Sequence, residues 1–198
     1  MKASTLLVFI VALVLLATLG LGMATIRHGF SAREQPSALE AAIATKLRSM
    51  ATPPSDKNAK NPVQATPEVL TEARDHFADH CAICHGNDGS GNTVIGQNLY
   101  PKAPDMRLER TQNLTDGEIY YIIHNGVRLT GMPAWGTDGA DEDSWKLVHF
   151  IRHLPHLTAD EVKGMEALNP KSESDRQEEQ EEEDFLNGKT PSKSAHHH

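Results

Sequence analysis

The sequence has few cysteine and few aromatic residues, and both shortages limit what the protein can be. Only two of its 198 residues are cysteine, Cys81 and Cys84. One such pair cannot build a multi-bridge disulfide framework, and it supplies too few ligands for the usual zinc sites. Aromatic residues make up 5% of the chain. A core so poor in large side chains is expected to need a buried cofactor.

Positive charge is scarce outside the N-terminal third. Residues 1–65 carry seven Lys and Arg against three Asp and Glu, whereas residues 66–157 carry seven against thirteen and residues 158–198 five against eleven. The net charge of the chain is −8. An acidic globular part argues against a nucleic-acid partner, because phosphate binding needs clustered Lys and Arg.

A single long hydrophobic run occurs, near the N-terminus. Thr5 to Ile26 contains no charged residue, and a helix of that length crosses the ~30 Å hydrocarbon core of a bilayer. The alternative is a cleaved signal peptide, with Gly22-Met23-Ala24 as its best small-residue cleavage site. Signal peptides usually have a shorter apolar region, of about 7–15 residues, so residues 1–26 are predicted to be a retained membrane anchor. Either interpretation places the rest of the chain outside the cytoplasm.

Residues 27–66 have the composition of a linker. Ser37 to Met50 is predicted to form a short amphipathic helix, with Ser37 as its N-cap and Glu40 three residues later. A stretch rich in Pro, Asn and Lys follows. We expect this segment to be a spacer that lifts a domain off the membrane.

Residues 67–157 are predicted to be an all-α globular domain. No strand pattern of convincing length occurs, and the region from His85 to Met106 has the Gly and Pro content of a loop. Three helices are expected: Pro67 to His80 capped by Thr66, Thr115 to Gly126 with a Thr115–Glu118 capping box, and Asp143 to Leu154 ended by Pro155.

Residues 158–198 are predicted to be an acidic tail. Eight acidic residues and one Arg lie between Glu173 and Asp184. Such a run repels itself and buries nothing, so it is expected to be disordered or at most a solvated helix.

The motif Cys81-Ala82-Ile83-Cys84-His85 is the most informative feature of the sequence. Two thiols at this spacing can add to the two vinyl groups of one haem, and His85 is then placed under the iron as the proximal ligand. This pattern marks covalent c-type haem attachment. The alternatives are a chance match or a thioredoxin-like redox pair, but such a pair usually lies near a βαβ pattern, which is missing here.

Met132 is the predicted sixth iron ligand. It lies in Gly131-Met132-Pro133, between two predicted helices, where a Met has little apolar helix face to join. A thioether suits low-spin haem iron and raises its potential. Met106 is the rival ligand, and His124 or an open sixth position remain further alternatives.

At these residues the domain resembles the class I cytochromes c. The attachment motif and the Met132-Pro133 loop match that family, as does Phe77, which stands four residues before Cys81. The segment Trp145 to Leu154 resembles the C-terminal helix of the family. The resemblance implies that this helix crosses the N-terminal one and that Phe77 packs near Val148 and Ile151.

The resemblance also implies neighbours for the haem. In the family a proline packs on the proximal histidine and a nearby carbonyl accepts its ring N–H; Pro101 and Pro104 are both candidates here. Tyr100, Arg128 and Trp135 are candidates for bonding the haem propionates, or equally for surface or core packing.

The expected function is electron transfer by one haem c per chain, held by two thioethers. With His85 and Met132 on the iron no substrate reaches it, so no enzymatic activity of its own is expected. The expected partners are an oxidase, a dehydrogenase or a quinol-oxidising complex, with the domain on the periplasmic side of a bacterial inner membrane. One alternative is a haem subunit within a larger oxidase or dehydrogenase. Another is a gas-binding or peroxidase-like protein with a labile sixth position.

Overall fold

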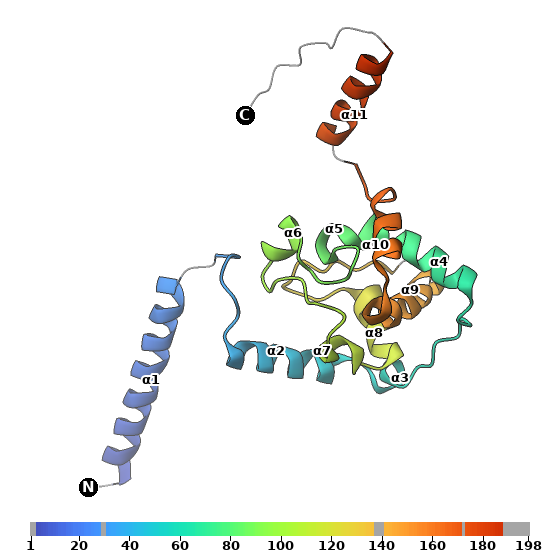
Figure 1. Cartoon of the computed structure of the whole chain (residues 1–198). Helices are drawn as coiled ribbons and strands as arrows, with labels where there is room; N and C mark the ends of the chain where they lie inside the picture. Colours follow the sequence, from blue (N-terminus) through green and yellow to red (C-terminus); the bar gives the residue numbers. More distant parts are fainter. Residues whose placement is uncertain (1–2, 29–30, 137–140, 172, 188–198) are drawn as a thin grey trace.

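The computed structural model describes residues 3–28, 31–136, 141–171 and 173–187. Within these ranges every regular element is helical, as predicted (Figure 1). The α-helices are α1 (Ala3–His28), α2 (Ala38–Ala51), α3 (Pro54–Lys57), α4 (Pro67–His76), α5 (Ala82–His85), α6 (Val94–Gln97), α7 (Glu109–Gln112), α8 (Asp116–Asn125), α9 (Asp141–His153), α10 (Ala159–Glu166) and α11 (Glu173–Leu186).

The predicted N-caps are confirmed. The Thr66 side chain accepts a hydrogen bond from the Val69 backbone N–H at 3.3 Å, with Pro67 in the first turn of α4. Thr115 and Glu118 form a reciprocal capping box at the start of α8. Each cap satisfies a backbone N–H that a helix start leaves unpaired, so these residues fix where the helices begin.

Helices α4 and α9 pack against each other and form the centre of the core. The rings of Phe77 and Phe150 lie 5.0 Å apart with their planes tilted by 54°. Val148 and Ile151 belong to the same buried cluster, as expected for Phe77. Stacking of Tyr120 on Trp145, with ring centroids 4.1 Å apart, joins α8 to α9.

The helix predicted from Pro67 to His80 differs in its last turn. α4 ends at His76, and a π-helical turn covers Phe77–Cys81 before α5 begins. The Ala82 N–H donates to the Phe77 carbonyl across this turn. A π-turn inserts one extra residue, which rotates everything after it by roughly 100° relative to a regular helix. The attachment motif therefore presents a different face from the one a continuous α-helix would give it.

The segment before α4 packs on the domain. The Asn61 side chain donates to the Trp145 carbonyl at 2.9 Å, and the His149 ring bonds the Val63 carbonyl at 2.9 Å. The Thr115 hydroxyl donates to the Lys57 carbonyl at 2.7 Å. Residues 57–63 are thus hydrogen-bonded to the start of α8 and to α9. A free spacer would make no such bonds, so this part of the predicted linker packs on the domain.

The chain after residue 157 also contributes to the fold. Thr158 and Glu161 form a capping box that starts α10, and Met165 on this helix is completely buried in the core. Helix α11 follows, and its terminal Phe185 and Leu186 are exposed. Helix α10 thus replaces the disorder predicted for Ala159–Glu166, whereas α11 agrees with the solvated helix that was the other expectation for residues 173–184. Residues 188–198 lie outside the described residues.

Candidate haem site

The Cys81–His85 motif begins at the end of the π-helical turn and runs through α5. Gly86 follows with a φ of 73°, in the left-handed region that glycine tolerates best, and so ends the helix directly after His85. Both cysteines are free and half-buried. The two thiols and the imidazole therefore come from little more than one turn of backbone.

The surroundings of the thiols keep them protonated. Burial, and to a lesser degree the nearby Cys84, raises the pKa of Cys81 to about 12. Burial also raises the pKa of the Cys84 thiol. A reactive redox pair needs at least one thiol with a lowered pKa. This environment is the reverse, so it argues against a thioredoxin-like pair.

Among the described residues, His85 has a buried ring nitrogen without a hydrogen-bond partner. This atom, Nδ1, makes no hydrogen bond of normal geometry. Burial lowers the pKa of His85, and the Pro104 carbonyl opposes this as a backbone acceptor facing the ring. Of the two candidate prolines, Pro104 is the one whose carbonyl raises the pKa of His85, against the larger effect of burial. A neutral imidazole with one nitrogen turned toward a carbonyl leaves its other nitrogen available to a metal.

Thr93 fastens the motif to the next segment of chain. Its hydroxyl lies 2.9 Å from the Ile83 carbonyl oxygen and 3.1 Å from that of Cys84, and it accepts the Gly96 N–H at 2.8 Å. The Gly91 N–H donates to the His85 carbonyl at 2.7 Å. These bonds satisfy carbonyls at the end of α5 that would otherwise lack partners, and they hold α6 against α5.

Met132 lies in a tight loop after α8. The Val127 N–H donates to the Met132 carbonyl at 3.0 Å, and the Met132 N–H donates to the Thr130 hydroxyl at 3.1 Å. Leu129, at the tip, has a φ of 62° and is 91% exposed. Both backbone groups of Met132 are therefore held, while its half-buried side chain belongs to no part of the buried core.

Two contacts bring this loop beside the motif. A Cβ atom on Gly131 would lie 2.6 Å from Leu99, so the loop lies directly against the chain that follows α6. Farther along, the Trp135 ring meets the His80 ring edge-on, with centroids 5.7 Å apart. His80 directly precedes Cys81. The Met132 loop is thus in contact with segments on both sides of the attachment motif.

The other candidates have different surroundings. Met106 is only 7% exposed and lies inside the core cluster. The Tyr100 hydroxyl donates to the Glu40 carboxylate of α2 at 2.6 Å. His124 stacks on Tyr120. Arg128 is exposed. Sequence reasoning missed Thr93 and Leu99, because neither belongs to the attachment motif nor to the ligand loop.

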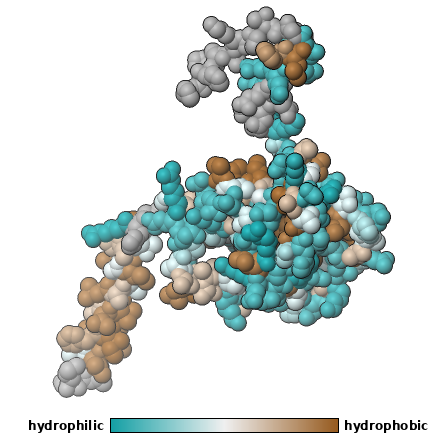
Figure 2. All heavy atoms as spheres, in the orientation of Figure 1, coloured by the Kyte–Doolittle hydropathy of each residue, from teal (hydrophilic) through white to brown (hydrophobic). Residues whose placement is uncertain are grey.

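Large apolar side chains are exposed around the motif. Figure 2 shows hydrophobic atoms on the face where α5 and α6 lie. Val94 is 83% exposed, and Ile83, Ile95, Leu129 and Trp135 are also exposed. Clustered exposed apolar side chains mark a surface that binds something. A flat apolar macrocycle fits such a surface, the two thiols suit the vinyl groups of a haem, and the imidazole and thioether donors suit its iron.

This chain carries a class I c-type cytochrome domain, the kind of protein that transfers electrons through haem c. The family model that matches is described as cytochrome c oxidase, cbb3-type, subunit III, and it covers residues 68–151, less than half of the chain. The matched range begins in α4 and ends in α9, so it spans the two packed core helices and the motif between them. A search among curated proteins found no match.

Proposed function

We propose that the domain binds a single haem c and carries one electron at a time, with Cys81 and Cys84 as the attachment residues and His85 and Met132 as the axial ligands. The observation that carries the proposal is the set of contacts of the Met132 loop with Leu99 and His80, one on each side of the motif. These contacts support a thioether and an imidazole that face one another across one site.

The chain's own residues have separate tasks. Each cysteine thiol adds its sulfur and its hydrogen across one vinyl group, so attachment neither consumes nor releases electrons. The Pro104 carbonyl is the acceptor available to the His85 ring N–H, and the Thr93 hydroxyl binds two carbonyls of α5. The hydrogen-bonded loop presents Met132. When bound, the haem supplies iron that alternates between the ferrous and ferric states.

We place the domain at a membrane. Ser4–Arg27 within α1 contains an 18-residue window with a mean hydropathy of 2.8, and the helix is long and apolar enough to span a bilayer. A signal sequence near an N-terminus passes the same test. The proposal is a retained anchor in a bacterial inner membrane, with the haem domain on the periplasmic side and a membrane oxidase, dehydrogenase or quinol-oxidising complex as redox partner.

The first experiment measures haem content and redox stoichiometry. Intact-mass analysis after acid–acetone extraction is expected to show the polypeptide plus one haem, and Cys81→Ala together with Cys84→Ala should lose it. A potentiometric titration should then give a single one-electron wave. Extractable haem, or rapid carbon monoxide binding by the reduced wild-type protein, would contradict the proposal and favour a gas-binding protein.

A second candidate is a haem subunit of a larger oxidase, and the matched family model favours it. A subunit is expected to remain with its catalytic partner during gentle detergent solubilisation. Affinity purification of the full chain from native membranes, followed by an oxygen-consumption assay, separates the two functions. If the protein is an isolated carrier, the purified sample is expected to consume no oxygen. If it is an oxidase subunit, the catalytic subunit copurifies and the sample consumes oxygen.

A further inference from the structure

Helix α2 has an exposed apolar stripe. Leu39, Ile43, Leu47 and Met50 are 71%, 50%, 60% and 69% exposed, and their spacing of four, four and three residues places them on one face. In a soluble segment such a stripe normally faces a core. Here it faces away from the domain, so something else is expected to cover it.

The other faces of α2 are fixed to the domain. The Tyr100 hydroxyl bonds Glu40 near the start of the helix, and the Arg110 guanidinium of α7 donates to the Thr45 hydroxyl at 3.2 Å. Near the C-terminal end, the Lys57 ammonium donates to the Ser49 hydroxyl at 3.1 Å. Bonds along its whole length therefore hold α2 with the apolar stripe outward.

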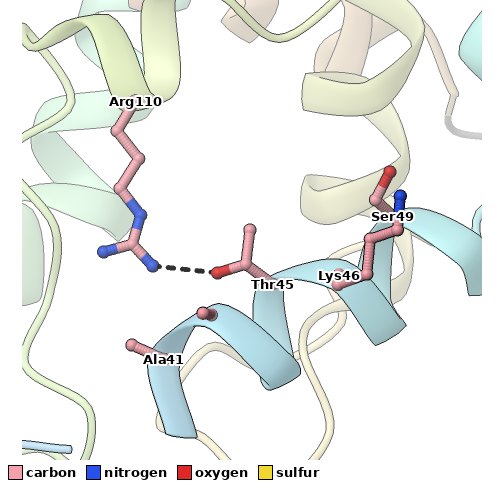
Figure 3. Close-up of a pocket in the computed structure, with 6 residues that line it drawn as sticks. Ala41, Thr45, Lys46, Ser49 and Arg110 are labelled. Atoms are coloured by element: carbon pink, nitrogen blue, oxygen red, sulfur yellow. Dashed lines mark hydrogen bonds between the residues drawn. The ribbon is translucent and has the colours of Figure 1, made fainter. Parts of the chain in front are cut away.

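A groove with two cationic side chains begins at the edge of the stripe and continues onto the face of α2 that is turned to the domain. It is open, has a volume of about 480 Å³ and lies between α2 and α7 (Figure 3). Its lining residues are Ala41, Ala42, Thr45, Lys46, Ser49 and Arg110. Lys46 follows Leu39 by seven residues and so lies next to the stripe. Arg48, half-buried near Arg110, adds a third cation, and burial followed by the Arg110 charge lowers its pKa.

The position of α2 in the chain points to a lipid surface. Nine residues separate the end of α1 from the start of α2, and nine residues reach at most about 30 Å. Residues 27–66 carry six basic against three acidic residues in a chain of net charge −8. A basic segment this close to a membrane-spanning helix is complementary to anionic phospholipid.

We propose that α2 lies in the plane of the bilayer that holds α1, with its apolar stripe at the boundary of headgroups and acyl chains and with Lys46 against lipid phosphates. Helices of this kind sink ~5–10 Å below the headgroups. Because Tyr100 and Arg110 join α2 to the domain, this contact fixes the height and orientation of the haem site over the membrane. The inference rests on the proposed retention of α1, and it does not depend on the iron ligands.

The test uses the full chain with its cofactor, in nanodiscs of phosphatidylcholine and phosphatidylglycerol. Leu47→Cys carries a spin label, and its collision rates are measured with oxygen, which concentrates in lipid, and with a water-soluble nickel chelate. The matched control is Phe185→Cys, an exposed apolar position on the acidic helix α11. Incorporation into the discs tests the anchor separately, and the absorption spectrum of each sample tests the proposed haem site.

The Leu47 label is expected to meet oxygen several-fold more often than the chelate, while the Phe185 label shows the reverse. Lys46→Gln should lower the equilibrium constant for docking of α2 on the anionic discs about fivefold, as reported by the collision rates of the Leu47 label. A basic residue near such a surface contributes about 1 kcal/mol. Lys60→Gln, outside the groove, is the charge control and should have a smaller effect. A Leu47 label open to the chelate overturns the proposal. A label shielded from both reagents means that protein covers the stripe, and also overturns it.

Discussion

The Thr93 hydroxyl lies 3.1 Å from the Cys84 carbonyl oxygen, so a side chain ten residues beyond the middle of the attachment motif helps hold that motif in place. Thr93→Val keeps the shape of the side chain but removes the hydroxyl that serves two carbonyls and one N–H. We expect the holo-domain to lose about 1–3 kcal/mol of stability, the cost of leaving such groups unpaired. Denaturant titration followed by haem absorbance measures this.

Thr71→Val is the matched control for that change. The Thr71 hydroxyl bonds only the Pro67 carbonyl within α4, in an exposed position. Its removal is expected to change stability by less than about 0.5 kcal/mol. Equal effects of the two substitutions would show that Thr93 does not stabilise the motif.

Helix α10 is expected to be an integral part of the fold. Met165 is completely buried, so Met165→Ala should lower the free energy of unfolding by about 2–5 kcal/mol. Ending the chain after Thr158 should cost at least as much. Ending it after Pro170 removes α11 but keeps α10, and should leave the stability of the domain nearly unchanged. If both truncations behave alike, α10 does not pack as described.

The sequence predicted the helices whose start signals are local. Ser37 and Thr115 are recognisable as caps from the glutamate three positions later, and Thr66 from the proline that follows it; each cap is present. The π-helical turn at Phe77–Cys81 has no such signal, because it inserts one residue without changing the apolar pattern enough to reveal it. The packing of Met165 also escaped prediction, because one buried Met in an acidic segment gives no periodicity.

The same distinction applies to the site. Cys81, Cys84 and His85 are recognisable because they are adjacent in the sequence, and the proposal still rests on them. The contacts with Leu99 and His80 could not be predicted, because they join segments 32 and 55 residues away from Gly131 and Trp135. Choosing between Pro101 and Pro104 likewise required the folded backbone, since both lie in the same short loop.

The capping box of α10 should make stability depend on acid. Hydrogen bonds from the Thr158 backbone and hydroxyl, and then from His153, lower the pKa of Glu161 from 4.5 to about 2. A carboxyl group whose pKa is lowered on folding stabilises the folded protein at pH values above 4.5, and this stabilisation is lost as the pH falls toward 2. We therefore expect the difference in Tm between wild type and Glu161→Gln to be largest near neutral pH and to shrink across this interval.

Glu166→Gln is the control for the acid effect, since Glu166 is an exposed residue at the end of the same helix. Its Tm difference should stay small at every pH. Thermal melts followed by far-ultraviolet circular dichroism give both series. A Glu161→Gln difference that stays constant down to acid pH would mean that the capping bonds do not favour the carboxylate.

The measurement that tests the central claim most directly is the absorption spectrum of the oxidised protein with Met132 or Met106 replaced by Ala. A sulfur-to-iron charge-transfer band in the red is expected for His and Met ligation in this family. Met132→Ala should abolish the band, lower the reduction potential and open the reduced iron to carbon monoxide. Met106→Ala, in the core, should lower stability and leave the band in place. Loss of the band with Met106→Ala and its survival with Met132→Ala would contradict the ligand assignment.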